Sequence, residues 1–89
     1  MIRMKYTFYG NVQGVGFWYR AYHAAQSLGL SGWVRNEYDG SVMMEVQGLR
    51  QDIDAMLDMI ENGHYISIDS MDSKEIAVDL NESSFGIDD

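Results

Sequence analysis

The sequence predicts an α+β domain in which one sheet carries two helices on one of its faces. Three observations lead to this prediction: the elements follow the order βαββαβ, both long connections between strands are helical, and a tight hairpin joins the middle strands. Because βαβ connections are right-handed, this order gives a ferredoxin-like sandwich with one antiparallel sheet of four strands and a possible short fifth strand. With 89 residues, the chain is expected to form one domain over residues 1–89.

The first half of the chain alternates strand and helix patterns. Residues 2–8 carry an apolar side chain at every second position, which is typical of a half-buried strand. Apolar residues then recur at helical spacing over 17–28, and Gly29 is placed to end this helix. A second strand is expected from residue 30 to about 38, and the dipeptide Asp39-Gly40 indicates a hairpin after it.

The second half repeats the pattern less clearly. A third strand is expected over 42–47 and an amphipathic helix over 53–60. Residues 64–72 are ambiguous between loop and strand. A fourth strand is expected near 71–80, and a short last strand over 84–88 is possible.

Composition excludes several classes of function. The chain has no cysteine, so disulfides, thiolate metal sites and a cysteine nucleophile are not available. His23 and His64 have no ligand spacing to a carboxylate pair, so neither a metal nor another cofactor is expected. No export signal or membrane span is recognised. A cytoplasmic protein is therefore expected. A monomer is also expected, although the sequence gives no signal for the oligomeric state.

Charge is distributed unevenly along the chain. The net charge is −8, which argues against nucleic acid as a partner. Residues 1–36 hold four basic residues and no acidic one, whereas residues 37–89 hold two basic residues and fourteen acidic ones. The first segment therefore carries +4 and is the one whose local field is expected to attract an anion.

The stretch from residue 10 to 20, GNVQGVGFWYR, joins the first strand to the first helix. Gly14 and Gly16 lie where the backbone must turn sharply. The first N–H groups of a helix have no intrahelical acceptor and carry a partial positive charge. This stretch is therefore expected to form an anion site.

Two stretches resemble the acylphosphatase family. Residues 10–17, GNVQGVGF, are similar to its phosphate-cradle loop. Residues 32–36, GWVRN, followed by Gly40, Val42 and Gly48, are similar to its second signature, which surrounds a catalytic asparagine. Both stretches occur in the expected order on the expected elements, so the chain is identified as a member of that family.

The resemblance implies hydrolysis of acyl phosphates, the mixed anhydrides of carboxylic and phosphoric acid, to carboxylate and phosphate by in-line attack of water. No metal and no covalent intermediate take part in that scheme. Asn36 would orient the attacking water, and an arginine at the end of the loop would clamp the phosphoryl oxygens. The phosphate cradle that the resemblance implies comprises the backbone amides of Gly14, Val15, Gly16, Phe17 and Trp18.

The chain departs from the family pattern at the arginine. In that pattern the arginine directly follows the phenylalanine of the loop, and here the position holds Trp18. An indole offers one neutral donor, and loss of a transition-state arginine typically costs about 10³–10⁵ in rate. Activity is therefore expected to be weak or absent. Arg20 is a candidate substitute clamp, although it lies about 200° around the helix from Trp18.

An alternative from a different class remains open. The chain can be a non-catalytic member that binds small anions or a protein partner through the same loop. The glycines would then serve only a tight turn, Asn36 would cap the hairpin, and Trp18 would pack against Tyr22 or Ala25. A dinucleotide fingerprint does not fit, because GVGFWY lacks the third glycine.

Overall fold

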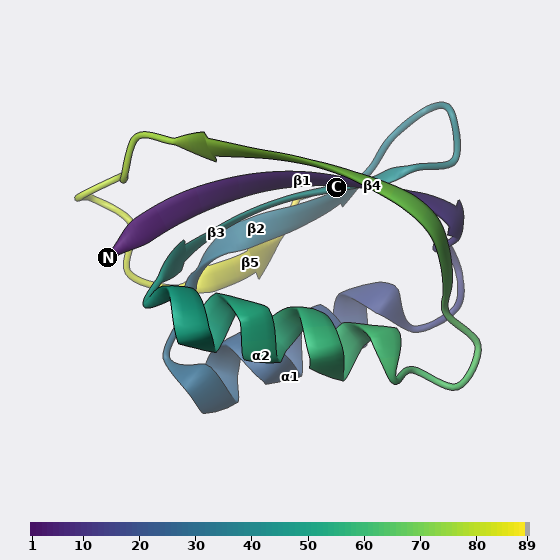
Figure 1. Cartoon of the computed structure of the whole chain (residues 1–89), viewed down its shortest axis with the longest axis horizontal. Coiled ribbons are helices and arrows are strands. Elements are labelled where there is room, and N and C mark those ends of the chain that lie inside the picture. The colour runs from purple at the N-terminus through teal and green to yellow at the C-terminus, as the bar shows by residue number, and fades with distance from the viewer. Residues whose placement is uncertain (89) are drawn as a thin grey trace.

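The computed structural model describes residues 1–88 and has the predicted element order with the fifth strand present (Figure 1). Asp89, the last residue of the expected domain, lies outside the described residues. The elements are β1 Ile2–Asn11, α1 Phe17–Leu28, β2 Ser31–Asn36, β3 Val42–Gly48, α2 Arg50–Glu61, β4 Ser67–Ile76 and β5 Phe85–Ile87.

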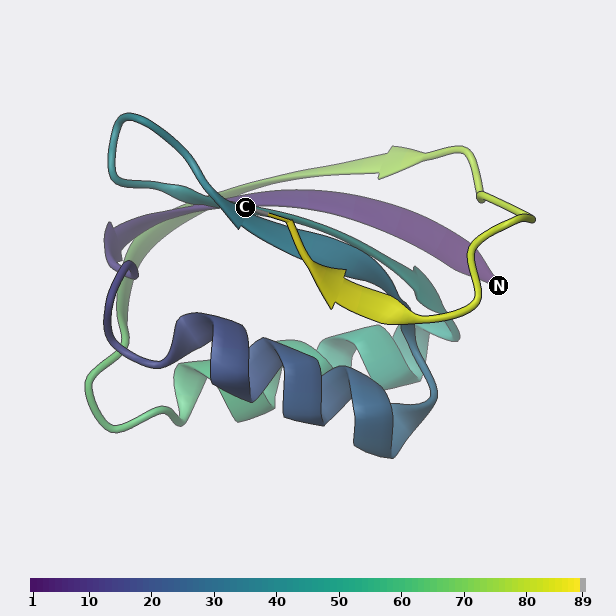
Figure 2. The same ribbon diagram turned by 180° about the vertical axis from the view of Figure 1, so that it is seen from behind.

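The sheet has the strand order β4-β1-β3-β2-β5. Its four long strands pair antiparallel, which confirms the predicted ferredoxin-like arrangement. β5 differs, because it pairs parallel to β2 and makes the sheet mixed. The chain leaves β4 at one edge of the sheet and enters β5 at the opposite edge, and Figure 2 shows the connection running around the end of the sheet.

Both helices cover the same face of the sheet, and the core lies between the two layers (Figures 1 and 2). The side chains of α1 that face this core are mostly small, so the helix packs close to the strands. α2 contributes larger apolar groups at helical spacing. The largest fully buried side chains are Phe8, Phe17, Met44, Ile53, Met56, Ile60, Val12, Val34, Val42 and Val46.

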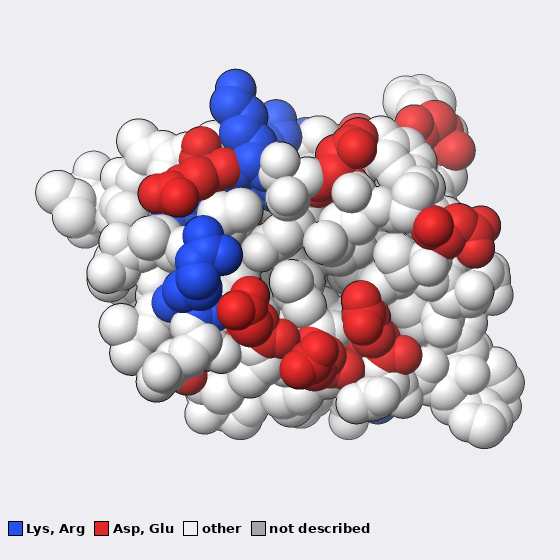
Figure 3. All heavy atoms as spheres, in the orientation of Figure 1, with Lys and Arg blue, Asp and Glu red and all other residues white. Residues whose placement is uncertain are grey.

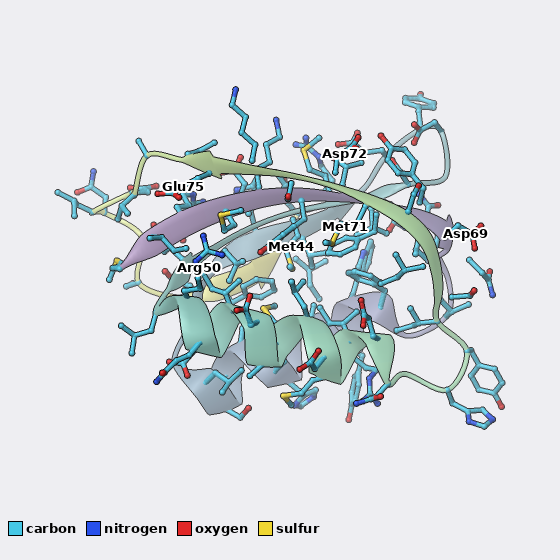
Figure 4. The ribbon with its side chains drawn as sticks, in the orientation of Figure 1. Met44, Arg50, Asp69, Met71, Asp72 and Glu75 are labelled. Carbon is cyan, nitrogen blue, oxygen red and sulfur yellow. The ribbon has the colours of Figure 1, made fainter. Side chains whose placement is uncertain are left out.

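The position of β4 corrects the sequence prediction. The strand spans Ser67–Ile76 rather than residues 71–80, so it covers most of the stretch that was ambiguous. It is an edge strand with mostly exposed side chains, and its polar sequence therefore lacks the apolar alternation that identifies a half-buried strand. In Figure 4, Met44 lies between the sheet and α2, and Asp72 lies on the far side of β4.

A buried arginine holds the connection from β4 to β5 against the open face of the sheet. Arg3 is 3% exposed, and it donates to Glu82 Oε1 at 2.8 Å, to Glu45 Oε1 at 3.0 Å and to Gln47 Oε1 at 2.9 Å. The hydrogen bond with Glu82 raises the pKa of Arg3 against the opposing effect of burial. Gln47 in turn exchanges two hydrogen bonds with the backbone of Asp79. These hydrogen bonds fix the path of the connection that leads from β4 to β5.

Candidate functional site

The loop between β1 and α1 requires glycine for its backbone conformation. Gly14 has φ 70° and Gly16 has φ 85°, both in the left-handed region. A Cβ at either position would meet no atom within 4 Å, so the backbone angles and not lack of space exclude other residues. The absence of side chains leaves the backbone of the loop open to a ligand.

The loop ends directly at the N-terminus of α1. Gly16 precedes the helix, and no side chain caps it. The first intrahelical donor after it is the Arg20 N–H, which reaches Gly16 O at 3.0 Å. The amides from Gly16 to Tyr19 thus precede the hydrogen-bonded turns, where donors have no intrahelical acceptor and the helix dipole is positive. This is the local arrangement that binds anions at helix ends.

Gln13 fixes the loop to the hairpin between β2 and β3. Its Nε2 donates to Glu37 O at 2.8 Å and to Ser41 O at 2.9 Å. The neighbouring Val12 is buried in the core at 1% exposure. The loop motif contains Gln13 but does not predict a role for it, because the two carbonyls that it binds lie more than twenty residues away in the chain.

Trp18 and Asn36 meet at this end of the molecule. The indole Nε1–H of Trp18 donates to Asn36 Oδ1 at 3.0 Å. Asn36 is the last residue of β2 and, by strand alternation, lies on the same face as the buried Val34. The fold therefore brings together the two residues that the sequence motifs singled out, which are 18 positions apart.

A cavity of about 320 Å³ opens beside this pair. Asn36 is the one polar amide in its lining, and the remaining side chains there are apolar or aromatic. Among residues 1–88, those that form the lining include no lysine, arginine or histidine. The lining residues are Val12, Gly14, Gly16, Phe17, Trp18, Tyr19 and Asn36.

Arg20 has a different partner from the one that a phosphate clamp requires. Its Nε donates to Met59 O at 2.8 Å, in the last turn of α2. Its side chain also packs against Gly63, where a Cβ would come within 2.7 Å of Arg20 Cδ. A cation at the C-terminal end of a helix is favoured by the helix dipole. The guanidinium is thus directed to α2, and Arg20 is not among the residues that line the cavity.

The other basic residues of the first segment also lie away from the loop. Arg3 and Lys5 alternate with the buried Met4 and Tyr6, so they lie on the open face of the sheet. Arg35 lies on the same face and pairs with Glu37 at 3.1 Å and Asp88 at 3.4 Å. The charge of +4 along the sequence therefore does not create a cationic cavity.

Acidic side chains are numerous on the surface away from the cavity. Figure 3 shows them spread over the face formed by α2 and β4, with the basic side chains gathered on one part of it. Within residues 1–88, no group of three or more histidine, aspartate or glutamate side chains is placed to hold a metal ion. Among the same residues, neither helix has the length and apolar character needed to cross a membrane.

Comparisons with known proteins agree with the fold. A model of the acylphosphatase family matches residues 4–87. The acylphosphatase of Oceanobacillus iheyensis is 40% identical over 89 residues, which cover 98% of each chain. The acylphosphatase of Clostridium perfringens is 40% identical over 86 residues, or 96% of this chain and 97% of that one. The crystal structure of the Bacillus subtilis acylphosphatase has a TM-score of 0.88 and 27% identity, with 98% of each chain covered.

Proposed function

Because the chain belongs to the acylphosphatase family, we propose that it binds acyl phosphates at the β1–α1 loop and hydrolyses them slowly. The observation that carries the proposal is the contact of Trp18 Nε1 with Asn36 Oδ1, two residues that line the cavity. It joins the loop motif to the asparagine motif and puts a neutral indole where the family resemblance implies an arginine. Phosphate, as product, is expected to bind at the same loop.

The backbone supports the binding step. The loop amides and the first amides of α1 supply donors and a positive dipole for the phosphoryl oxygens. Gln13 holds the loop at a fixed distance from the hairpin turn that directly follows Asn36. Phosphoryl transfer depends mainly on positioning and on charge stabilisation. Fixed backbone donors contribute to both.

The neutral indole of Trp18, bonded to Asn36, is the reason that we propose slow turnover. Asn36 Oδ1 keeps a second lone pair, and its amide nitrogen keeps two donors, so the side chain can still hold a water molecule. The indole, however, brings no positive charge to the phosphoryl oxygens in the transition state. Arginine at such sites contributes about 10³–10⁵ in rate. We therefore assign water positioning to Asn36 and no catalytic role to Trp18.

The alternative is binding without catalysis. It is favoured by the same contact, because a carbonyl oxygen engaged by the indole is less available to orient a nucleophile. In that case the chain binds phosphate or acyl phosphates and releases them unchanged. A cytoplasmic, monomeric protein without nucleic-acid or membrane partners stays a prediction from the sequence in both cases.

The decisive experiment is hydrolysis of acetyl phosphate, followed as released acetate with subtraction of the rate without enzyme. The proposal expects slow turnover that is inhibited by inorganic phosphate and falls at least tenfold in Asn36→Ala. Asn62→Ala is the matched control, since Asn62 is an exposed amide at the end of α2. No turnover in the parent protein, with phosphate still bound, would select the non-catalytic alternative.

A second variant decides the role of Arg20. Because its guanidinium is engaged by Met59 O, Arg20→Ala is expected to keep the acetyl phosphate rate within about twofold once stability is matched. A loss of turnover in folded Arg20→Ala would show that the arginine reaches the phosphoryl group during the reaction and would restore it as a clamp.

A further inference from the structure

We propose that the cavity selects acyl phosphates with an apolar acyl group, aromatic or branched aliphatic, and that the Trp18 ring is the residue that determines this selectivity. The inference rests on the proposed function, because it concerns the acyl end of the same ligand. It adds a substrate class that the loop alone does not specify, since the loop amides contact only the phosphoryl end.

The polar and apolar parts of the cavity are separated. Its polar groups are the loop backbone and the Asn36 side chain, which lie at the N-terminus of α1 and at the end of β2. A phosphoryl group must lie against these donors. The walls that remain for the acyl group come mainly from the rings of Trp18 and Tyr19, and the buried Val12 and Phe17, each 1% exposed, close the cavity toward the core.

The orientation of Trp18 presents its apolar surface to the ligand. The one polar atom of the indole is already satisfied by Asn36 Oδ1. The ring carbons are the part left to line the cavity, and the side chain is half-buried against the core, which restricts its movement. Tyr19 adds a second ring whose centroid lies 4.3 Å from that of His23.

The cavity is larger than a phosphoryl group alone would fill. Its volume of about 320 Å³ lies at the lower end of the range for small-molecule sites. Without a cation in the lining, the described residues offer the phosphoryl dianion only dipoles and neutral donors. Differences in affinity between acyl phosphates are then set by the acyl group, because burial of its apolar surface is the largest remaining contribution to the free energy of binding.

The test compares two stable analogues that share one charged group, acetylphosphonate and benzoylphosphonate, by isothermal titration calorimetry. The proposal expects benzoylphosphonate to bind at least tenfold more tightly, with inorganic phosphate displacing both ligands. It expects Trp18→Phe to keep most of this ratio, since a ring remains, and Trp18→Gln to reduce the ratio to about one. Leu80→Gln removes an exposed apolar side chain outside the lining and should leave the ratio unchanged.

The outcomes separate the two proposals. Equal affinity for the two analogues, both displaced by phosphate, would overturn the apolar selectivity and leave the proposed function intact. A tenfold ratio that survives in Trp18→Gln would overturn the role of Trp18. Failure of phosphate to displace either analogue would overturn the proposed function, and the inference with it.

Discussion

The two ends of the sheet use charge in opposite ways. On the open face near the start of β1, Arg3 is buried and paired with Glu45 and Glu82. At the β1–α1 loop, where the family resemblance implies an arginine, the cavity has a neutral Trp18 and backbone donors. The buried arginine of this chain therefore holds the fold, and the loop that we propose as the anion site offers glycines and a helix N-terminus instead of a cation.

The largest expected effect comes from giving the loop the charge that it lacks. Trp18→Arg would place a guanidinium beside Asn36, where it can bind two phosphoryl oxygens. Turnover of acetyl phosphate is expected to rise at least a hundredfold, because an arginine at such a site contributes about 10³–10⁵. Gln26→Arg adds the same charge on the exposed surface of α1 and controls for net charge. An unchanged rate in a folded Trp18→Arg variant would show that Asn36 and the amides are not arranged for the reaction.

The opposite change tests the structural arginine. Arg3→Met removes the buried cation and leaves two carboxylates and Gln47 without their partner. Breaking such a pair is expected to lower the free energy of unfolding by about 3 kcal/mol. The control is Arg50→Met, because Arg50 lies 4.0 Å from Glu75 in an exposed pair (Figure 4) whose loss should cost less than about 1 kcal/mol. Urea denaturation measures both, and equal losses would refute the structural role of Arg3.

A smaller effect is expected where the loop is attached to the hairpin. Gln13→Ala removes both side-chain hydrogen bonds to the carbonyls of Glu37 and Ser41, which keep only their backbone donors within the hairpin. It should cost about 1–3 kcal/mol of stability and also weaken phosphate binding, because the loop loses its fixed position. Gln51→Ala, at an exposed position of α2, is the control. If phosphate affinity in Gln13→Ala matches that of the control, the loop holds its shape without Gln13.

The smallest effect concerns the hairpin itself. Hydrogen bonds from the side chain and backbone of Ser41 hold the pKa of Asp39 below its ordinary value of 3.8. A carboxyl with a lowered pKa in the folded state adds stability above its unfolded pKa, and this gain is lost as the pH falls through the folded value. The difference in Tm between the parent protein and Asp39→Asn should therefore shrink between pH 7 and pH 3. A difference that stays constant over this range would show that ionisation of Asp39 does not contribute.

Residue patterns were sufficient to predict the helices and strands that are buried on one face. β1, both helices and the hairpin follow from apolar periodicity and glycine positions, because each has a clear inner side. β4 was misplaced, since an exposed edge strand needs no apolar alternation, and the direction of β5 depends on a network around Arg3 that spans distant residues.

The motifs identified which site residues to examine but not how they interact. The contact of Trp18 with Asn36 and the two bonds of Gln13 join residues far apart in sequence, so only the folded chain reveals them. The positive charge counted along the first segment of the sequence did not predict the charge around the cavity. Strand alternation turns Arg3, Lys5 and Arg35 to the open face, although they belong to the same basic segment of the sequence as the loop.

The most direct test of a backbone anion site is a phosphate titration of the ¹⁵N-labelled protein by NMR, with chloride at matched ionic strength as the control. The account predicts the largest shifts at the amides of residues 14–19 and at the Trp18 indole N–H, with the Nε–H of Arg20 unmoved. Shifts at the Arg20 Nε–H with unmoved loop amides would contradict it, because the anion would then be held by a side-chain cation and not by the glycine loop.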